Sequence, residues 1–161
     1  MKNGCYALFI LSLMNGFMYA EALIEGKVSK IPRTMDFYVF YLRDENGVKI
    51  GEIQFKIYAT RVKKTDEETV TKVANIDLIR VDESNRNAGN GQRLLEVALN
   101  RMIASGCTLI EARVDANNKP SLHLFQKNGF NKTKITPHSL GESILLQKNL
   151  ASQGQHTKAA G

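Results

Sequence analysis

The chain has 161 residues, of which 43% are hydrophobic and 24% are charged, and its formal net charge is +6. This length and balance predict one globular domain that buries its own core. The chain has two cysteines, and one of them, Cys5, lies in an N-terminal apolar stretch. So few cysteines argue against a fold held together by disulfide bonds. The three histidines are far apart in sequence and form no metal-ligand spacing, so no metal is expected.

The basic excess is compatible with nucleic acid, an anionic surface or a phosphorylated cofactor as a partner. The lysines are scattered, and neither an arginine-rich helix nor a nucleic-acid motif accompanies them. A solvated basic surface is therefore the default interpretation, and no nucleic-acid partner is expected. A secreted protein that binds nucleic acid or an anionic surface is kept as an alternative.

The N-terminus predicts a secretory signal peptide over residues 1–22. Lys2 precedes an apolar run from Cys5 to Met14, and Ala20-Glu21-Ala22 supplies an A-x-A exit. The run is too short for a stable membrane span. An uncleaved anchor or a translation start at Met35 are the competing interpretations. Residues 23–35 then form an extension, 36–150 the main domain, and 151–161 a tail of disordered composition.

Alternating apolar residues predict β-strands through much of the main domain. The predicted strands are about 37–42, 48–59, 71–81, 107–114, 131–135 and 142–149. DENG at Asp44–Gly47 is typical of a hairpin turn, and the charged segment Arg61–Thr69 predicts an exposed turn. In the third strand, alternation places Asp77 on one face with Asn75 and Ile79, and Arg80 on the other face.

Two helices interrupt the strands. The first follows Gly91, with an apolar stripe at helical spacing formed by Leu94, Leu95, Ala98, Leu99 and Met102. Gly106 is placed to end it, and a strand follows at once, so strand, helix and strand form a βαβ crossover with a parallel pair. The second, shorter helix is expected from about Lys119 to Asn128, ending at Gly129.

The turn into the first helix has the composition of a phosphate-binding loop. Gly89 and Gly91 flank one residue where the strand gives way to the helix. Glycine lets backbone N–H groups approach an anion closely, and a helix N-terminus adds unpaired N–H groups and a positive field. An ordinary glycine-containing turn between a strand and a helix would have the same sequence. The GNG sequence alone does not decide between such a turn and a phosphate-binding loop.

Two motifs in register resemble the GNAT N-acetyltransferase superfamily, whose members transfer acyl groups from acyl-CoA, usually to amines. The family's pyrophosphate loop, R/Q-x-x-G-x-G/A, corresponds to Arg86–Gly91, and DANNKPSLHLFQKNGF is similar to its second cofactor motif. The resemblance covers about residues 37–149. It implies an α/β fold with a mixed sheet of about six to seven strands, a splayed parallel pair and two main helices.

The resemblance also implies a binding site for acetyl-CoA as co-substrate. The residues expected to contact it are Ile79, Arg80, Val81, Arg86, Asn87, Ala88, Gly89, Asn90, Gly91, Gln92, Asn118, Ser121 and Phe125. Backbone amides of the loop would hold the pyrophosphate, and the strand Ile79–Val81 would bond the pantetheine arm. Arg93 and Lys119 are weaker candidates for the ribose phosphate, because ordinary surface charge explains them equally well.

Acyl transfer needs a base for the amine and an acid for the leaving thiolate. Many family members use a tyrosine as the acid, but the matching position here is Phe125, which cannot donate a proton. Ser121, His123 or a water are the remaining candidates. Asp77 is the preferred base and Glu111 the reserve. The competing interpretation of Asp77 is a solvent-facing residue or a partner of a lysine.

The sequence thus predicts an N-acyltransferase for an unidentified amine acceptor, small molecule or protein. Because Phe125 replaces the tyrosine, a CoA-binding module without turnover is the main alternative. The acceptor groove is expected from residues 22–35, the Arg61–Thr69 turn and the final hairpin, which are basic overall. The signal-like N-terminus indicates export whereas acetyl-CoA indicates a cytosolic site of action, and the oligomeric state, a homodimer included, is open.

Overall fold

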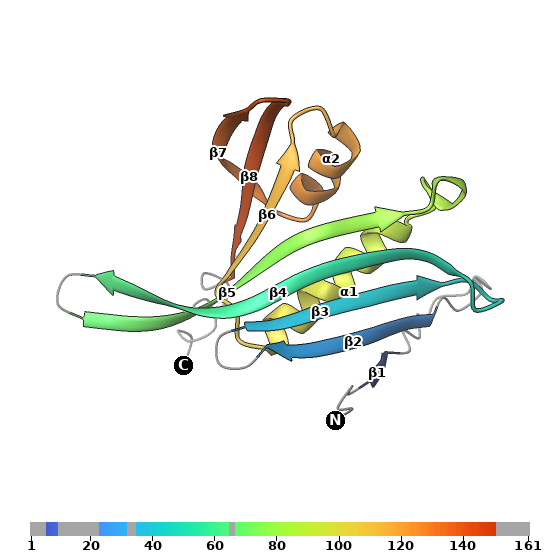
Figure 1. Ribbon diagram of the computed structural model, residues 1–161, viewed down its shortest axis with the longest axis horizontal. Helices are drawn as coiled ribbons and strands as arrows, with labels where there is room; N and C mark the ends of the chain where they lie inside the picture. The colour runs from blue at the N-terminus through green and yellow to red at the C-terminus, as the bar shows by residue number, and fades with distance from the viewer. Residues whose placement is uncertain (1–5, 10–22, 32–34, 65–66, 151–161) are drawn as a thin grey trace, which may run out of the picture. The chain divides into compact units, whose positions relative to one another are not determined.

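The computed structural model describes residues 6–9, 23–31, 35–64 and 67–150, and side chains within 35–61 and 70–150. The elements in chain order are β1 Tyr6–Phe9, β2 Leu23–Ile31, β3 Met35–Arg43, β4 Lys49–Lys64, β5 Glu67–Val81, a 3-10 turn Glu83–Asn85, α1 Asn90–Ala104, β6 Leu109–Asp115, α2 Lys119–Lys127, β7 Asn131–His138 and β8 Gly141–Asn149 (Figure 1).

The strands form one sheet in the order β1-β2-β3-β4-β5-β6-β8-β7. β5 and β6 are parallel, with Val73 opposite Leu109 and Ile76 opposite Ala112, whereas β1–β2, β2–β3, β6–β8 and β7–β8 are antiparallel. The predicted mixed sheet with a parallel pair and two helices is confirmed. β1 and β2 extend it to eight strands and fall in the N-terminal stretch for which the sequence predicts no strand.

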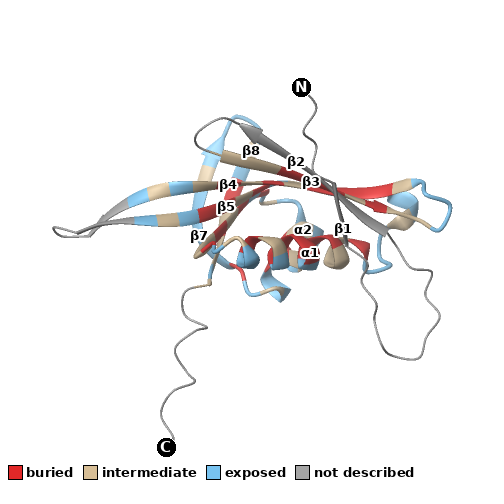
Figure 2. Ribbon diagram, turned by 90° about the horizontal axis from the view of Figure 1, so that it is seen from below, coloured by how far each residue is buried: buried red, intermediate tan, exposed pale blue. Residues whose placement is uncertain are grey.

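The chain divides into two compact units, which we describe separately. Unit 1 comprises residues 1–56 and 77–100, and unit 2 comprises residues 57–76 and 101–161. The unit 1 part of α1 (residues 90–100) lies along one face of the unit 1 strands (Figure 2). Its core residues are Phe40, Leu42, Ile53, Phe55, Leu94 and Leu95, all essentially inaccessible to solvent.

Aromatic packing and one glycine define the face of unit 1 that α1 covers. The ring of Tyr38 stacks on Phe55 with the centroids 4.8 Å apart, and the edge of Phe40 meets Phe55 at 5.4 Å. A Cβ on Gly51 of β4 would lie 3.1 Å from the Leu94 Cδ1 atom of α1 and 2.9 Å from the Arg80 carbonyl oxygen of β5. Glycine at 51 therefore allows α1 and β5 to approach β4 closely.

Unit 2 packs α2 and the end of α1 with its own strands. Its core includes Met102, Ile110, Ala112, Leu122, Phe125, Phe130 and Leu146. The apolar stripe predicted for α1 is confirmed, because Leu94, Leu95, Ala98, Leu99 and Met102 are all buried. No helix in the described part of the chain combines the length and the apolar composition needed to cross a membrane.

Two local predictions need correction. The segment Arg61–Thr69 is not an exposed turn, because β4 continues to Lys64 and β5 begins at Glu67, and only residues 65–66 lie outside the two strands. Continued pairing of β4 with β5 satisfies backbone groups that a long turn would leave to water. The charged composition of this segment therefore belongs to a long hairpin.

The second correction concerns the faces of β5. Asp77 pairs with Lys56, and Arg80 pairs with Glu52, although Lys56 and Glu52 lie on the same face of β4. Asp77 and Arg80 are an odd number of residues apart, so strict alternation would put them on opposite faces. The two ion pairs require a change of face between them, as a β-bulge provides. Asp77 and Arg80 therefore share one face.

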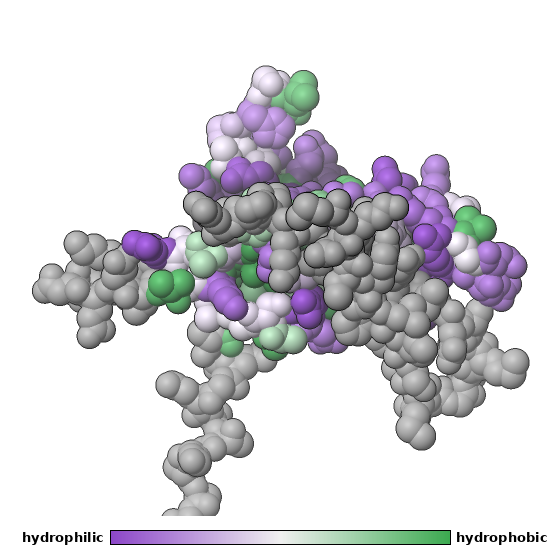
Figure 3. Space-filling view, turned by 60° about the horizontal axis from the view of Figure 1, so that its bottom comes forward, coloured by the Kyte–Doolittle hydropathy of each residue, from purple (hydrophilic) through white to green (hydrophobic). Residues whose placement is uncertain are grey.

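The ends of the chain stay largely outside the described residues. Of the predicted signal peptide over 1–22, the structure describes only Tyr6–Phe9, and the predicted tail 151–161 lies wholly outside the described part. The leader and the tail therefore stay predictions. The extension over 23–35 also stays a prediction as a separate segment, and the structure places β2 (Leu23–Ile31) of the sheet within it. Figure 3 shows a predominantly hydrophilic coloured surface on which hydrophobic side chains occur in small groups.

Candidate functional site

The loop between β5 and α1 in unit 1 is the structure's candidate anion-binding site. After the 3-10 turn, Asn87 takes a φ of 61° and Gly89 a φ of 78°, both in the left-handed region. Asparagine and glycine are the residues that adopt this conformation at least cost. Helix α1 then begins at Asn90, two residues before the predicted start at Gln92. The loop therefore folds back sharply onto the helix N-terminus.

This conformation leaves a row of backbone donors open. The backbone N–H groups of Asn87 to Gly91 donate to no partner among the described residues, and the first bond of the helix runs from the Arg93 N–H to the Gly89 carbonyl, at 3.1 Å. The first turn of α1 contains no acidic side chain. Successive open amides with a helix field behind them are a strong anion receptor.

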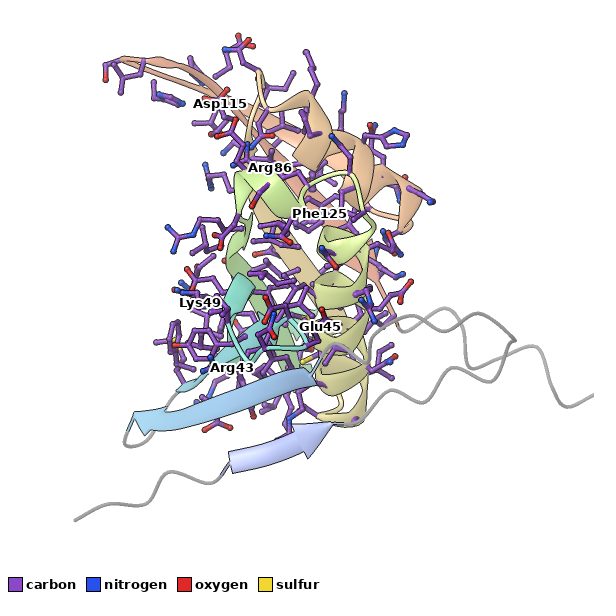
Figure 4. The ribbon with its side chains drawn as sticks, turned by 90° about the vertical axis from the view of Figure 1, so that its right-hand side faces the viewer. Arg43, Glu45, Lys49, Arg86, Asp115 and Phe125 are labelled. Atoms are coloured by element: carbon purple, nitrogen blue, oxygen red, sulfur yellow. The ribbon has the colours of Figure 1, made fainter. Side chains whose placement is uncertain are left out.

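Two side chains hold the loop from within. The buried Asn90 donates through Nδ2 to the Asn85 carbonyl at 2.9 Å, and Arg86 donates through Nε to the Val81 carbonyl at 3.1 Å. Arg86 is otherwise exposed and lies beside the end of β5 (Figure 4), so its remaining N–H groups are available to a ligand. These two hydrogen bonds help to fix the conformation of the loop.

The second motif builds the start of α2 in unit 2. Asn118 is the N-cap, and its Oδ1 accepts from the Ser121 N–H at 3.2 Å. Lys119 donates through Nζ to the Ala116 carbonyl at 3.0 Å. Asn118 and Ser121 are therefore brought together, as the motif predicts, but the Asn118 oxygen is engaged in capping the helix.

Phe125 is a core residue of α2. Its side chain is 2% exposed, and its ring meets Phe130 in an edge-to-face contact with centroids 5.0 Å apart. Gly129 between them has a φ of 81°, which lets the chain leave the helix and return Phe130 to the core. The predicted contact of Phe125 with the cofactor stays a prediction, and the structure gives its ring a packing role.

The candidate acid and base residues are distributed over the two units. Asp77 in unit 1 bonds Lys56 at 3.0 Å, and the two side chains are 35% and 34% exposed, so the alternative of a lysine partner is correct. Glu111 in unit 2 accepts from Gln147 Nε2 at 2.7 Å. His123 is exposed on α2, and Ser121 is half-buried. A catalytic role for Asp77 or Ser121 stays a prediction.

One charged residue of unit 1, Glu52, was not among the site residues predicted from the sequence. The Glu52 carboxylate on β4 is buried, and it accepts from Arg80 Nη2 at 2.7 Å and from Lys49 Nζ at 2.8 Å. For Arg80, the sequence predicts only that its backbone, as part of the strand Ile79–Val81, bonds the pantetheine arm. The signal in the sequence was a glutamate between Gly51 and Ile53, in the more apolar first half of the strand, with a lysine three residues before it.

The described residues contain no group of three or more His, Cys, Asp or Glu side chains able to hold a metal ion. The single cysteine among them, Cys107, is buried, and burial raises the pKa of its thiol while Lys72 lowers it by a smaller amount. Such a thiol is a small hydrophobic side chain and a poor nucleophile.

Comparison with known proteins places these features in a family. A model of the Acetyltransferase (GNAT) family matches residues 12–130. The chain is 32% identical over 99 residues to the Bacillus subtilis (strain 168) protein named "Putative phosphinothricin acetyltransferase YwnH". That match covers 62% of this chain and 56% of the relative, so the chain spans just over half of that protein's length.

Solved structures share the fold. Arabidopsis thaliana NAA60 in complex with acetyl-CoA has a TM-score of 0.57 at 16% identity, over 71% of this chain and 76% of its own. An acetyltransferase from Bacillus cereus ATCC 14579 also has a TM-score of 0.57, at 23% identity, over 72% of this chain and 74% of its own. The loop, the second motif, the topology and the matched family agree, and the chain belongs to the GNAT acetyltransferase family.

Proposed function

We propose that the protein transfers an acetyl group from acetyl-CoA to an amine. The observation that carries the proposal is the row of open amides from Asn87 to Gly91, at the position of the family's pyrophosphate loop. The structural neighbour from Arabidopsis thaliana was solved with acetyl-CoA bound, which supports the same donor here.

The loop fits a pyrophosphate chemically. A diphosphate needs several donors around closely spaced oxygens, and the loop offers consecutive N–H groups without a side chain at Gly89, where a Cβ would find no atom within 4 Å. The helix field contributes typically about 0.3–1 kcal/mol per favourable charge. Arg86 can add charge-assisted bonds with the N–H groups that Val81 does not use.

In the proposed reaction the acceptor nitrogen forms a bond to the thioester carbonyl carbon, and the carbon–sulfur bond breaks. Asp77 is the proposed base that receives the ammonium proton, and Ser121 the proposed donor to the departing thiolate. The Asp77 side chain is partly exposed to solvent. Its ion pair with Lys56 must break before Asp77 can accept the proton. Asp77→Asn is therefore expected to lower kcat and to leave the affinity for acetyl-CoA unchanged.

A thermal-shift and calorimetric titration with acetyl-CoA tests the proposal. Wild-type protein should be stabilised by millimolar acetyl-CoA, and Gly89→Glu should abolish that shift because it places a carboxylate against the amides. Gly47→Glu is the matched control, because Gly47 has a φ of 77° against 78° at Gly89 and a Cβ at either position meets nothing within 4 Å. No shift for wild-type protein at millimolar acetyl-CoA would overturn the proposal.

The second candidate is a CoA-binding protein without turnover. It is favoured by Phe125, which has no hydroxyl and is packed in the core of unit 2. Mass spectrometry of amine and peptide panels incubated with acetyl-CoA separates the two candidates. Acetylated product formed faster than in protein-free controls eliminates the binding protein, whereas acetyl-CoA binding without product from any panel favours it.

A further inference from the structure

Glu52 is a buried carboxylate in unit 1 to which the proposed reaction assigns no task. Its side chain is 6% exposed, and each of its oxygens accepts from a different cation, Arg80 on β5 and Lys49 at the start of β4. The two cations remain open to solvent, with 57% of the Arg80 side chain and 37% of the Lys49 side chain exposed. A buried anion thus fixes the positions of two accessible cations.

These charges lie on the face of the sheet away from α1. Gly51 points toward Leu94 of α1, so its neighbour Glu52 points to the opposite face. Figure 4 shows Lys49 on the side of β3 and β4 away from α1, and its Nζ lies 5.1 Å from the centroid of the Tyr41 ring. The cation–π contact adds a further constraint on the Lys49 ammonium.

The cluster has an excess of positive charge and an unused donor fork. Among the described residues of this ion-paired cluster, Lys49, Lys56 and Arg80 oppose Glu52 and Asp77, which is three positive charges against two negative, or a net +1. Arg80 uses one nitrogen, Nη2, on Glu52, and within the described residues its Nε and Nη1 have no partner. A guanidinium held in this way can bind a second carboxylate through two parallel N–H bonds.

We propose that Arg80, held by Glu52 and assisted by Lys49, recognises the carboxylate of the acceptor, so that the acceptor is a small amine that also carries a carboxylate. This inference rests on the proposed function. Arg80 belongs to the strand segment Ile79–Val81, whose backbone is proposed to bond the pantetheine arm, so the anion-binding side chain is attached to the strand that carries the acyl donor. The amine reacts and the carboxylate stays ionised throughout.

Paired substrates that differ only by the carboxylate test this inference. Methionine is compared with 3-(methylthio)propylamine, phenylalanine with phenethylamine, and leucine with isoamylamine, following the release of CoA thiol in the presence of acetyl-CoA. Because an α-carboxylate lowers the pKa of the neighbouring amine, kcat/KM is calculated on the concentration of unprotonated amine, and we expect it to be at least tenfold higher for the carboxylate member of each pair that reacts. Equal rates within the pairs, a preference for the decarboxylated amines, or turnover of none of the carboxylate amines would overturn the inference.

Variants locate the effect. Arg80→Gln should raise the KM for the carboxylate amines at least tenfold and leave the Kd of acetyl-CoA within about twofold. Because that variant leaves Glu52 with one partner, the double variant Arg80→Gln/Glu52→Gln removes both charges, and it should lose the carboxylate preference equally. Lys127→Gln, an exposed lysine in the last turn of α2, makes the same change in net charge and should have no effect.

The failures of the two proposals are distinguishable. An absent thermal shift with acetyl-CoA contradicts the proposed function, whatever the amine. A normal shift and normal turnover without discrimination by the carboxylate contradict only the role of Arg80. Preference retained in the folded double variant would move carboxylate recognition to another residue and also overturn the inference.

Discussion

The loop between β5 and α1 and the segment that begins α2 both lead into a helix, yet they use their backbone donors in opposite ways. In unit 1 the amides from Asn87 to Gly91 have no partner within the described residues. In unit 2 the Ser121 N–H is taken by the Asn118 side chain, and Leu122 N–H bonds the Asn118 carbonyl at 3.0 Å. Pro120 has no N–H to satisfy.

This difference separates a segment built to receive a ligand from one built to hold its own helix. Open donors at a helix N-terminus are tolerated where water or an anion can reach them. A capped terminus followed by a buried aromatic pair, Phe125 and Phe130, instead contributes to the stability of its unit. We therefore expect changes in the two regions to separate stability from acetyl-CoA binding.

The largest expected effect is that of Phe125→Ala on stability. Removing a ring that is 2% exposed and packed against Phe130 should lower the free energy of unfolding by about 3–5 kcal/mol. Urea unfolding followed by circular dichroism measures the loss, with the exposed neighbour Gln126→Ala as the control. If Phe125 acts only in the core, the folded variant should bind acetyl-CoA within about threefold of wild type. Weakening beyond tenfold would restore Phe125 to the cofactor contacts.

A smaller loss of stability is expected from Gly51→Ala in unit 1. This substitution should also weaken acetyl-CoA binding. The new Cβ would lie 2.9 Å from the Arg80 carbonyl oxygen and 3.1 Å from Leu94 Cδ1, so β5 or α1 must shift. Overpacking of this kind costs about 1–3 kcal/mol. Because α1 begins with the loop amides, its displacement should also weaken acetyl-CoA binding. Calorimetric titration alongside urea unfolding checks both effects, and a variant with wild-type stability would contradict the close approach.

Much of unit 1's candidate site was predictable because its signals are local. The glycines at 89 and 91 and the apolar stripe of α1 lie within one stretch of sequence. The start of α1 was predicted to within two residues, and the burial of the stripe is confirmed. The cap by Asn118 is equally local. These features depend on backbone conformation and helical spacing, which a single segment encodes.

The features that escaped prediction depend on pairing between strands. Nothing within β4 alone shows that Glu52 will be buried and paired with Arg80, because Arg80 comes from another strand and only Lys49 lies in β4 itself. The faces of Asp77 and Arg80 were assigned by strict alternation, which an irregularity in β5 defeats. The length of the β4–β5 hairpin was likewise hidden by its charged composition, since an exposed strand and a turn use similar residues.

The smallest expected effect on stability is that of substitutions at Asn118. Matched substitutions at Asn118 and Asn90 compare the starts of the two helices directly. Asn118→Ala removes the acceptor for the Ser121 N–H and should cost about 1 kcal/mol, while Asn118→Asp keeps an acceptor and should be nearly neutral. Asn90 has the reverse polarity, because its Nδ2 donates to the Asn85 carbonyl.

Asn90→Asp replaces that donor by an acceptor and brings a negative charge to the loop, so it should lower stability and also acetyl-CoA affinity. The same chemical change is thus expected to be tolerated at one helix start and harmful at the other. Parallel urea unfolding and acetyl-CoA titration of the three variants measure this. Equal behaviour of the two aspartate variants would mean that the two helix starts do not differ in the way their hydrogen bonds indicate.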